Sequence, residues 1–360
     1  MSPVLAQFLV NGGPGSAAGE RAERVAAAID GRTVVTYRSG GRLRDAVAMA
    51  RSVNEVDPQV VYSMDLALTP SIAWLIAGRR PMIVDTGDTP RFFLDLIDAS
   101  LPARWLATAL ERITYGGATR IVVRGEHHRT QLIEAGHHHV SVIPDGVDLE
   151  TIRPMDVSSL REQLGIDDVL TVGVQGNFTW FPQLGGGIGW DLVEAMGRRK
   201  DLGVHAVFIG DGPGIAELRK LADRHGIADR VHVIGRVPYA ELPRYLSLCD
   251  VTLLTQTNDP SSWARTTGKL PTYLASGRHV LSSRVGTAAD LLPDAHLIDY
   301  VGHWDETYPD RLGERLALLE ADAIATRAAG DALRPLSEAF DYDDIAAQLA
   351  DEVMTIAGAR

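Results

Sequence analysis

The sequence predicts an α/β protein made of two Rossmann-like domains, each a parallel β-sheet covered by helices on both faces. Short apolar segments rich in β-branched residues alternate with helical patterns along most of the chain, which is typical of parallel sheets. A proline- and glycine-containing turn at 144–146 separates two such runs. The 360 residues suggest roughly two domains. We expect these domains at 1–150 and 151–340, followed by a terminal helix at 341–360.

The composition limits the classes of partner. The net charge is −12, with 45% hydrophobic and 23% charged residues, so a nucleic acid is not an expected partner. No apolar stretch approaches the roughly 18 residues that span a bilayer, and residues 1–10 lack the basic start of a signal peptide. Membrane association is therefore not favoured. Cys249 is the only cysteine, which excludes an intramolecular disulfide and fits a buried position in a cytoplasmic protein.

The first half is expected to form a parallel sheet with helices between its strands. The strands are predicted at 4–10, 33–37, 59–62, 81–85, 120–123 and 140–143. Ser16 is a suitable N-cap for a helix that ends near Ile29, and further helices are predicted at 42–54, 71–78 and 100–115. The last of these is amphipathic around Trp105, and we expect it to pack like an ordinary helix.

A glycine-rich loop follows the first strand and contains Gly13 and Gly15, with Gly19 in the next helix. A similar arrangement binds the pyrophosphate of nicotinamide or flavin cofactors. Here the glycine spacing differs from that fingerprint, and the strand at 33–37 ends without the acidic residue that would hold a ribose. A nicotinamide enzyme with its site at 13–19 stays as one alternative.

The second half repeats the alternation. Strands are predicted at 169–174, 205–209, 231–234, 250–254, 279–282 and 295–298, and helices include 215–225, 240–248 and 342–357. The glycines at 185–187 are predicted to form a loop, in which they either allow close backbone approach or make a flexible turn. The histidines at 127–128 and 137–139 are expected to be solvated polar surface and not a metal site.

A candidate anion site lies at 265–268, where a loop is expected to enter a helix. Free backbone N–H groups and the positive end of the helix dipole attract anions at such a point. Arg265 and Lys269 add positive charge. A diphosphate could be bound there without a metal, and the alternative is a capped helix with two solvated cations.

The residues at 142–154, VIPDGVDLETIRP, resemble the interdomain signature of family 4 glycosyltransferases. Those enzymes are retaining, use nucleotide sugars and have the GT-B fold, in which two Rossmann-like domains face each other and the last helix crosses back to the first domain. The resemblance is strongest over 140–281 and implies the same fold and activity here. It also implies that several loops border the interdomain cleft, namely those with Gly13, Gly15, Gly146, Gly176 and Asn177.

The resemblance implies roles for single residues. It implies Asp88 as the catalytic residue on the acceptor side, with Asp65 and Asp85 as further candidates. The nucleoside would contact Gly210, Val237 and Thr272. The donor diphosphate would be bound by Arg265, Thr266, Thr267, Gly268 and Lys269. The co-substrate would be a nucleoside-diphosphate sugar and the acceptor a small molecule or glycoside, with no other cofactor and no metal.

The sequence departs from the family pattern at two places. Asn177 and Gln183 stand where relatives carry an arginine and a lysine that face the donor diphosphate, and Ala264 and Thr272 replace a pair of glutamates. A threonine can make single hydrogen bonds but cannot hold two ribose hydroxyls as a carboxylate can. Two further alternatives follow. One is a catalytically reduced or non-catalytic nucleotide-sugar-binding partner of another transferase, and the other is a GT-B enzyme that couples cyclitol-type substrates.

Overall fold

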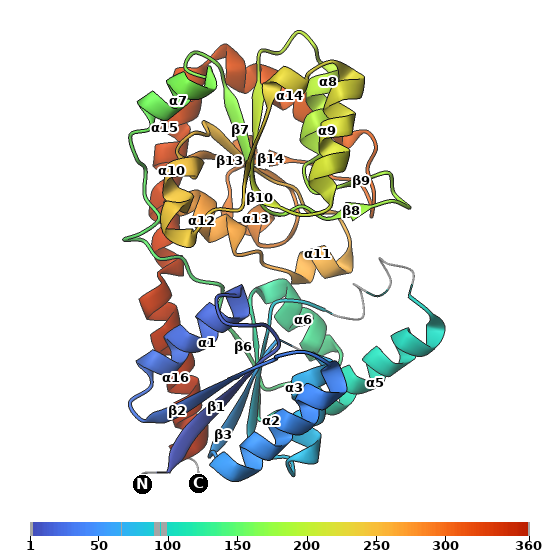
Figure 1. Ribbon diagram of the computed structural model, residues 1–360, viewed down its shortest axis with the longest axis vertical. Coiled ribbons are helices and arrows are strands. Elements are labelled where there is room, and N and C mark those ends of the chain that lie inside the picture. The colour runs from blue at the N-terminus through green and yellow to red at the C-terminus, as the bar shows by residue number, and fades with distance from the viewer. Residues whose placement is uncertain (1–2, 66, 90–93, 95–98, 359–360) are drawn as a thin grey trace. The chain divides into compact units, whose positions relative to one another are not determined.

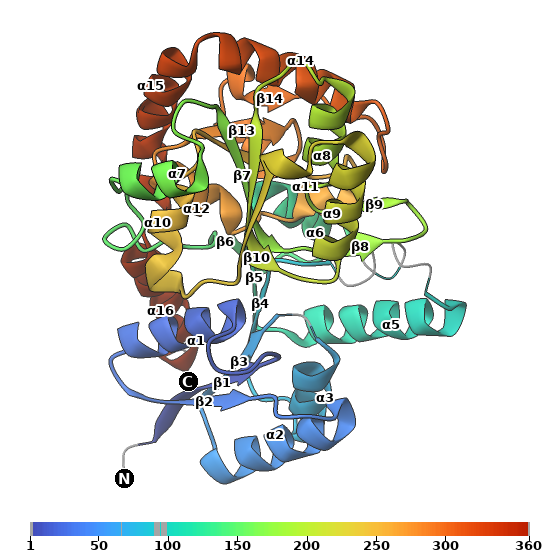
Figure 2. The same cartoon turned by 45° about the horizontal axis from the view of Figure 1, so that its top comes forward.

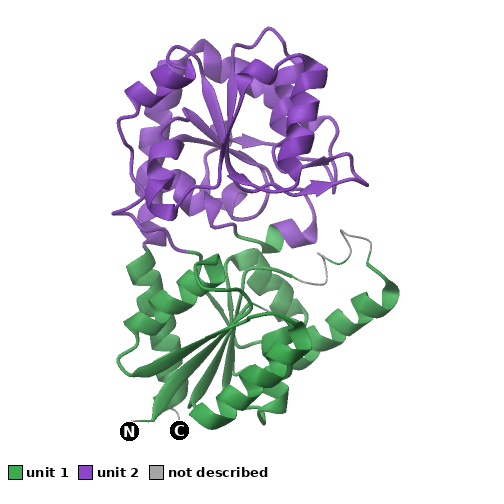
Figure 3. Cartoon of the chain, viewed as in Figure 1, with its two compact units in different colours: residues 1–145, 263–266, 342–360 green, residues 146–262, 267–341 purple. Residues whose placement is uncertain are grey.

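The computed structural model describes residues 3–65, 67–89, 94 and 99–358. The chain divides into two compact units, which are coloured separately in Figure 3. Unit 1 comprises residues 1–145, 263–266 and 342–360, and unit 2 comprises residues 146–262 and 267–341. The first change of unit falls between Asp145 and Gly146, inside the turn that separates the two runs of strands and helices in the sequence.

Unit 1 contains a six-stranded parallel sheet in the order β2-β1-β3-β4-β5-β6. Its strands are β1 (Val4–Val10), β2 (Arg32–Tyr37), β3 (Val60–Met64), β4 (Met82–Thr86), β5 (Arg120–Val123) and β6 (Val140–Val142). Its helices are α1 (Ala17–Ala28), α2 (Arg42–Val56), α3 (Leu68–Ile76), α5 (Leu101–Gly117), α6 (Glu126–Glu134) and α16 (Tyr342–Gly358). The predicted parallel α/β fold of this half is confirmed (Figures 1 and 2).

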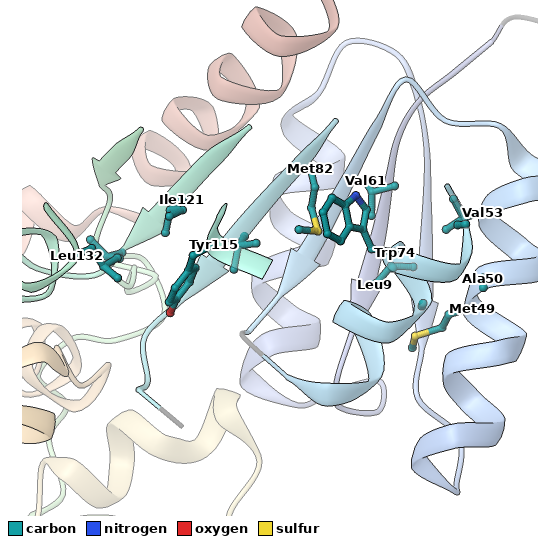
Figure 4. Packing of buried hydrophobic residues seen from close by; sticks show 14 residues of the cluster. Leu9, Met49, Ala50, Val53, Val61, Trp74, Met82, Tyr115, Ile121 and Leu132 are labelled. Atoms are coloured by element: carbon teal, nitrogen blue, oxygen red, sulfur yellow. The ribbon is translucent and has the colours of Figure 1, made fainter. Parts of the chain in front are cut away.

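The apolar core of unit 1 forms where α2 and α3 cover one face of the sheet. Met49 and Val53 of α2 and Trp74 of α3 pack with strand residues such as Leu9 and Val61 (Figure 4). Each is nearly inaccessible to solvent, and burial of a side chain of this size stabilises the fold by about 1.5–3 kcal/mol. The indole Nε1 of Trp74 donates to the carbonyl of Arg80 at 2.7 Å, so its one polar group is satisfied inside the core.

The other face of the sheet is covered by α1 and by the terminal helix α16 (Figure 2). Ser16 caps α1 as predicted, because its side chain accepts from the N–H of Gly19 at 3.1 Å. Helix α16 is held by Glu352, which accepts from Ser141 Oγ at 2.5 Å and pairs with Arg120 at 3.0 Å. The last helix therefore belongs to unit 1, although most of unit 2 separates it from that unit in the sequence.

Helix α5 is more exposed than the prediction of ordinary packing implied. Only Thr114 and Tyr115, in its final turns, are buried, whereas Leu101 and Trp105 are 78% and 75% exposed. The prediction failed because amphipathic spacing shows that a helix has an apolar face, but not what covers that face. In the part of the chain that the structure describes, no helix combines the length and apolar character needed to cross a bilayer.

Unit 2 contains a second six-stranded parallel sheet in the order β11-β10-β7-β12-β13-β14. Its strands are β7 (Thr171–Asn177), β10 (His205–Asp211), β11 (Val231–Gly235), β12 (Val251–Leu254), β13 (His279–Ser283) and β14 (Leu297–Ile298). Its α-helices are α7 (Ser158–Leu164), α8 (Trp190–Arg198), α9 (Gly214–His225), α10 (Leu242–Leu246), α11 (Pro260–Ala264), α12 (Lys269–Ala275), α13 (Gly286–Leu291), α14 (Tyr308–Ala321) and α15 (Ala323–Leu333).

Two features of unit 2 differ from the sequence prediction. The glycines at 185–187 are not simply a loop, because β8 (Trp180–Phe181) and β9 (Gly186–Gly187) form a small antiparallel hairpin. A side chain at Gly186 would collide with Trp304 and Trp190, which explains a glycine in this strand. Helix α11 was not predicted, because its five residues are too few to produce a helical pattern.

A buried ion network organises the carboxyl edge of the sheet in unit 1. Asp85 is fully buried at the end of β4 and accepts from Arg21 Nε at 2.9 Å, from Tyr62 at 2.7 Å and from Arg124. Burial raises the pKa of Asp85, but Arg124 and Arg21 outweigh it and lower the pKa to about 2. Arg21 also donates to the carbonyl of Pro144 at 2.8 Å, so the network holds the last residues of unit 1.

Asp85→Asn is expected to lower the free energy of unfolding by about 3–5 kcal/mol, because it removes the fully buried carboxylate that Arg21 and Arg124 share and leaves them only the partly exposed Asp145. Urea unfolding would measure the loss. The matched control is Asp57→Asn, which removes an ion pair that Arg80 makes with a largely exposed carboxylate, and it should change stability little. Since the pKa of Asp85 lies below its usual 3.8, the wild-type advantage should persist above pH 4 and fade as the pH falls toward about 2. Equal losses in both variants would contradict the network's role.

Cys249 is buried as predicted. A side chain at Gly173 of β7 would overlap its sulfur, and burial raises the pKa of the thiol to about 12. A neutral thiol without solvent contact reacts slowly, because the thiolate is the nucleophile.

Cys249 is therefore expected to resist a thiol reagent in the native protein and to react promptly in denaturant. A colorimetric thiol assay would follow the rate. Lys220→Cys places a thiol at an exposed position of α9 and serves as the reactive control. Native-state labelling of Cys249 as fast as that control would show that unit 2 opens readily around β7.

Candidate functional site

Each sheet has a point where its strand order reverses. In unit 2 the reversal lies between β7 and β12, and in unit 1 it lies between β1 and β3. In open α/β sheets, ligands bind in the crevice outside the carboxyl ends of the strands at this switch point. The residues that follow β7 and β12, and those that follow β1 and β3, therefore lie where each sheet would bind a ligand.

At the carboxyl end of β7, Gly176 lies beside the side chain of Lys269. A Cβ at Gly176 would be 2.9 Å from Lys269 Cε and 3.1 Å from Nζ, and Gly176 has a φ of +143° that side-chain-bearing residues rarely adopt. The backbone is thus bare at this strand end, and the ammonium group of α12 lies against it. Asn177, the last residue of β7, is exposed.

The neighbouring strand end is also glycine for a steric reason. Gly210 of β10 pairs with Gly176, and a Cβ at Gly210, whose φ is +136°, would overlap the Gly176 carbonyl. Gly212 has a φ of +146° and faces the carbonyl of Phe178. Gly210 lies inside β10 and not in the loop after it, because the strand continues to Asp211.

Asp191 is a buried carboxyl group that sequence reasoning missed. It lies in the first turn of α8, and its Oδ2 accepts from the hydroxyl of Thr255, the residue after β12. Burial raises the pKa of Asp191, while Thr255 and the charge of Lys269 act in the opposite direction. Asp191 and Lys269 thus belong to one electrostatic group at the β7/β12 switch point. An aspartate in the first turn of a helix is usually interpreted as a charge that stabilises the helix dipole. The sequence therefore does not indicate its interaction with Lys269.

The segment 265–269 is divided between the two units. Lys269 opens α12 in unit 2, whereas residues 263–266 belong to unit 1 by their contacts. Within unit 1, Arg265 Nε lies 3.3 Å from Asp88 Oδ1. Thr267 and Gly268 form the turn before α12, where Thr267 Oγ1 accepts from the N–H of Lys269 at 3.3 Å. Thr266 is buried.

Thr272 and Ala264, the two replacements for glutamate, are both buried. The hydroxyl of Thr272 donates to the carbonyl of Gly268 one helical turn earlier, at 2.9 Å. Its neighbour Tyr273 accepts from the N–H of Gln175 at 2.8 Å. That bond joins the second half of α12 to β7.

The remaining predicted positions lie in loops or at strand ends. Gly13 and Gly15 follow β1, where the carbonyl of Gly13 accepts from Ser16 Oγ at 2.7 Å and Gly15 has a φ of +74°. Gly146 is the first residue of unit 2. Val237 is half-buried in the loop after β11, and Gln183 is exposed between β8 and β9.

The histidine prediction was wrong for one residue. His128, in the first turn of α6, is 1% exposed, and neither ring nitrogen has a hydrogen-bond partner among the described residues. Burial and the charge of Arg124 lower its pKa to about 4. A pair of adjacent histidines at the start of a helix is usually predicted to be exposed, but in α6 the second of them, His128, lies on the buried face. No group of three or more His, Cys, Asp or Glu side chains suited to a metal ion occurs in the described ranges.

Part of the chain matches a known family model. Residues 175–301 match the family model described as glycosyl transferases group 1. The matched residues all lie within the range of unit 2 apart from 263–266, and the two parallel sheets give the chain the GT-B fold.

Curated relatives match over part of their length. The 2-deoxystreptamine glucosyltransferase of Streptomyces kanamyceticus is 27% identical over 195 residues, which is 51% of this chain and 48% of that protein. The D-inositol 3-phosphate glycosyltransferase of Segniliparus rotundus is 27% identical over 212 residues, or 57% and 44%. The matched region thus spans less than half the length of each of these relatives.

Solved structures match the whole chain. HepE of Anabaena in complex with UDP-glucose has a TM-score of 0.76 at 20% identity, covering 97% of this chain and 99% of that one. The sucrose-phosphate synthase of Thermosynechococcus elongatus has a TM-score of 0.77 at 17% identity, covering 100% of both chains. At this identity the likeness concerns the fold.

Gly210→Ala is expected to destabilise unit 2 by about 3 kcal/mol or more, because it combines a disfavoured φ with overlap on the Gly176 carbonyl. Urea unfolding followed by tryptophan fluorescence would measure the loss. Gly226→Ala is the matched control, since Gly226 also has a positive φ, +70°, but faces open space, and it should cost about 1–2 kcal/mol. Similar losses in the two variants would show that the β7 and β10 ends can separate without cost.

Proposed function

We propose that the protein is a retaining, metal-independent glycosyltransferase that moves a sugar from a nucleoside-diphosphate sugar to a small-molecule or glycoside acceptor. The observation that carries the proposal is the position of Lys269 against the bare backbone of Gly176, at the switch point of a group 1 glycosyltransferase domain. This ammonium takes over the role of the two cations that Asn177 and Gln183 replace. A diphosphate at that point would meet a fixed positive charge and exposed backbone groups.

The donor half of the reaction rests on unit 2. As the bond between sugar and diphosphate breaks, negative charge grows on the leaving phosphate, and preorganised donors lower the energy of that state most. Lys269 supplies the charge, and Thr267 and Gly268 lead into its helix. Arg265 and Thr266 belong to unit 1, so the donor half in unit 2 rests on Lys269. The carboxyl group of Asp191 accepts a hydrogen bond from Thr255 and interacts electrostatically with Lys269. Gly210 and Val237 are assigned to the nucleoside.

The acceptor half is assigned to unit 1, where Asp88 follows β4 and pairs with Arg265. The acceptor hydroxyl would attack on the face that the diphosphate leaves, so the configuration at the anomeric carbon is retained. The names of the relatives support a polyhydroxylated acceptor, because they include a 2-deoxystreptamine glucosyltransferase and a D-inositol 3-phosphate glycosyltransferase. The HepE complex with UDP-glucose supports a nucleotide sugar as donor.

One observation favours a second candidate, a non-catalytic nucleotide-sugar-binding partner of another transferase. The hydroxyl of Thr272 is bonded to the carbonyl of Gly268, and Ala264 is buried, so neither position offers a carboxylate to the donor. Multiple turnovers of donor per protein molecule would reject this candidate. A GT-B enzyme coupling cyclitols is distinguished by its acceptor.

Lys269→Ala is expected to abolish thermal stabilisation by a nucleoside diphosphate. A ligand at about 100 times its dissociation constant adds about 2.7 kcal/mol to the unit that binds it, which raises the midpoint by several degrees. Differential scanning fluorimetry with UDP, GDP, dTDP, ADP and NAD, tested side by side, measures the shift. Lys220→Ala, which removes an exposed lysine of α9 in the same unit, should keep it. Stabilisation by NAD alone would move the site to the loop at 13–19.

A further inference from the structure

Asp65, a further acceptor-side candidate in the sequence, lies at the switch point of unit 1 and has no role in the proposed function above. It follows β3 directly, and the pairing of Val10 with Met64 brings the end of β1 level with the end of β3. The glycine loop with Gly13 and Gly15 leaves the sheet on one side of this reversal, and Asp65 leaves it on the other. This is the position at which doubly wound sheets bind small ligands.

The backbone of Asp65 is in a conformation that side-chain-bearing residues rarely adopt. Its φ is +66°, and in the described ranges only Asp57 and Arg79 share a positive φ among the residues that are not glycine. Asp57 ends helix α2 and Arg79 follows α3 closely, so both belong to ordinary helix ends. Asp65 follows a strand and is held by its N–H, which donates to the Asp85 carbonyl at 2.8 Å. Strained residues of this kind gather at functional sites.

The side chain of Asp65 is half-buried, and its carboxylate has no hydrogen-bond or ion-pair partner in the part of the chain that the structure describes. Its acidic neighbours differ. Asp85 is bound by Arg21, Tyr62 and Arg124, and Asp88 pairs with Arg265. A partly desolvated carboxylate without a donor is unfavourable, which indicates that its partner is a ligand.

The charges around Asp65 agree with this position. Burial raises its pKa to about 6, opposed by Arg124 at the end of β5 and assisted by Asp85 and Asp88 at the end of β4 and by Asp145 after β6. Above that pH the group is ionised, and a charged carboxylate accepts a stronger hydrogen bond from a hydroxyl than a neutral one does.

We propose that the carboxylate of Asp65, together with the glycine loop after β1, forms the acceptor subsite of unit 1 and accepts a hydrogen bond from a hydroxyl of a polyhydroxylated acceptor. This inference rests on the proposed glycosyltransferase function and deepens it, because it assigns the acceptor to the β1/β3 switch point. Asp65 orients the acceptor hydroxyl there, whereas the carboxylate of Asp88 is exposed and already paired with Arg265.

Asp65→Asn tests the proposal, because asparagine keeps the shape and tolerates a positive φ but loses the charge. The assay uses UDP-glucose as donor and a panel of glucose, myo-inositol and 2-deoxystreptamine as acceptors. The variant should raise the acceptor KM about tenfold or more, with UDP stabilisation unchanged. In the wild type, acceptor kcat/KM should increase as the pH rises through about 6, and the variant should lose this limb. Asp57→Asn, which makes the same change at another positive-φ aspartate, should leave all three readouts unchanged.

Stability gives a readout that a purely structural role would not share. The folded-state pKa of Asp65 lies above its usual 3.8, so the ionised group weakens the native state as the pH rises through about 6. Asp65→Asn should therefore match or exceed the wild-type melting temperature, and its advantage should be larger at pH 7.5 than at pH 5. A melting temperature below that of Asp57→Asn would overturn the proposal in favour of a structural turn.

The outcomes separate two failures. Absence of stabilisation of the wild type by any nucleoside diphosphate would overturn the proposed function and, with it, this role of Asp65. Intact UDP stabilisation with an unchanged acceptor KM in Asp65→Asn would overturn only the role of Asp65. UDP stabilisation without transfer from UDP-glucose to any acceptor of the panel would reject the subsite for polyhydroxylated acceptors of this kind.

Discussion

The contact on which the proposed chemistry depends is the approach of two bare backbones at the ends of β7 and β10. Gly176 and Gly210 pair there, and any side chain at Gly210 would occupy the space of the Gly176 carbonyl. Because Gly176 also lacks a side chain, Lys269 lies directly against the strand end. Glycine at both strand ends leaves room for one cation beside the end of β7, which is where the proposed function places the diphosphate. The same contact would be destroyed by the Cβ of any other residue.

The switch point of unit 1 carries a different kind of charged group from that of unit 2. Its carboxyl edge is organised by Asp85 between Arg21 and Arg124, a buried group whose charges are satisfied internally. Arg21 extends this network to the carbonyls of Ile143 and Pro144, and thus to the residues where the chain leaves the unit. With those charges satisfied, the carboxylate of Asp65 stands out because it is partly desolvated and the described residues offer it no partner. Unit 2 thus presents a cation at its switch point and unit 1 presents a carboxylate.

Much of the fold could be predicted from the sequence, because hydrophobic alternation and glycine–proline turns are local signals. The strand at Val4–Val10, the Ser16 cap and the burial of Cys249 all follow from such signals. The prediction errors arose where tertiary contacts determine whether a side chain is buried or exposed. The exposure of Trp105 depends on which elements cover α5, the burial of His128 depends on the direction in which α6 turns it, and the β8–β9 hairpin is too short to produce a pattern.

The site was less accessible to sequence reasoning than the fold. The sequence singled out Lys269 and Gly176 separately, but their contact joins residues far apart in the chain. Asp191 looked like a helix-start charge, and its coupling to Lys269 depends on tertiary structure. The segment 265–269 looked continuous, whereas its residues are divided between the two units. Sequence patterns identify residues that are able to bind or react. Only the tertiary structure shows which of them are neighbours.

The central claim is catalysis of sugar transfer with retention. The most direct measurement is an NMR assay of product formation from the glucose conjugate of the nucleoside diphosphate that stabilises the protein, with glucose, myo-inositol and 2-deoxystreptamine as acceptors, the protein far below the donor concentration and EDTA present. The account predicts many turnovers per protein molecule, unaffected by EDTA, and a new glycosidic bond that keeps the α-configuration of the donor. No more than one turnover, dependence on added metal, or a β-linked product would contradict it.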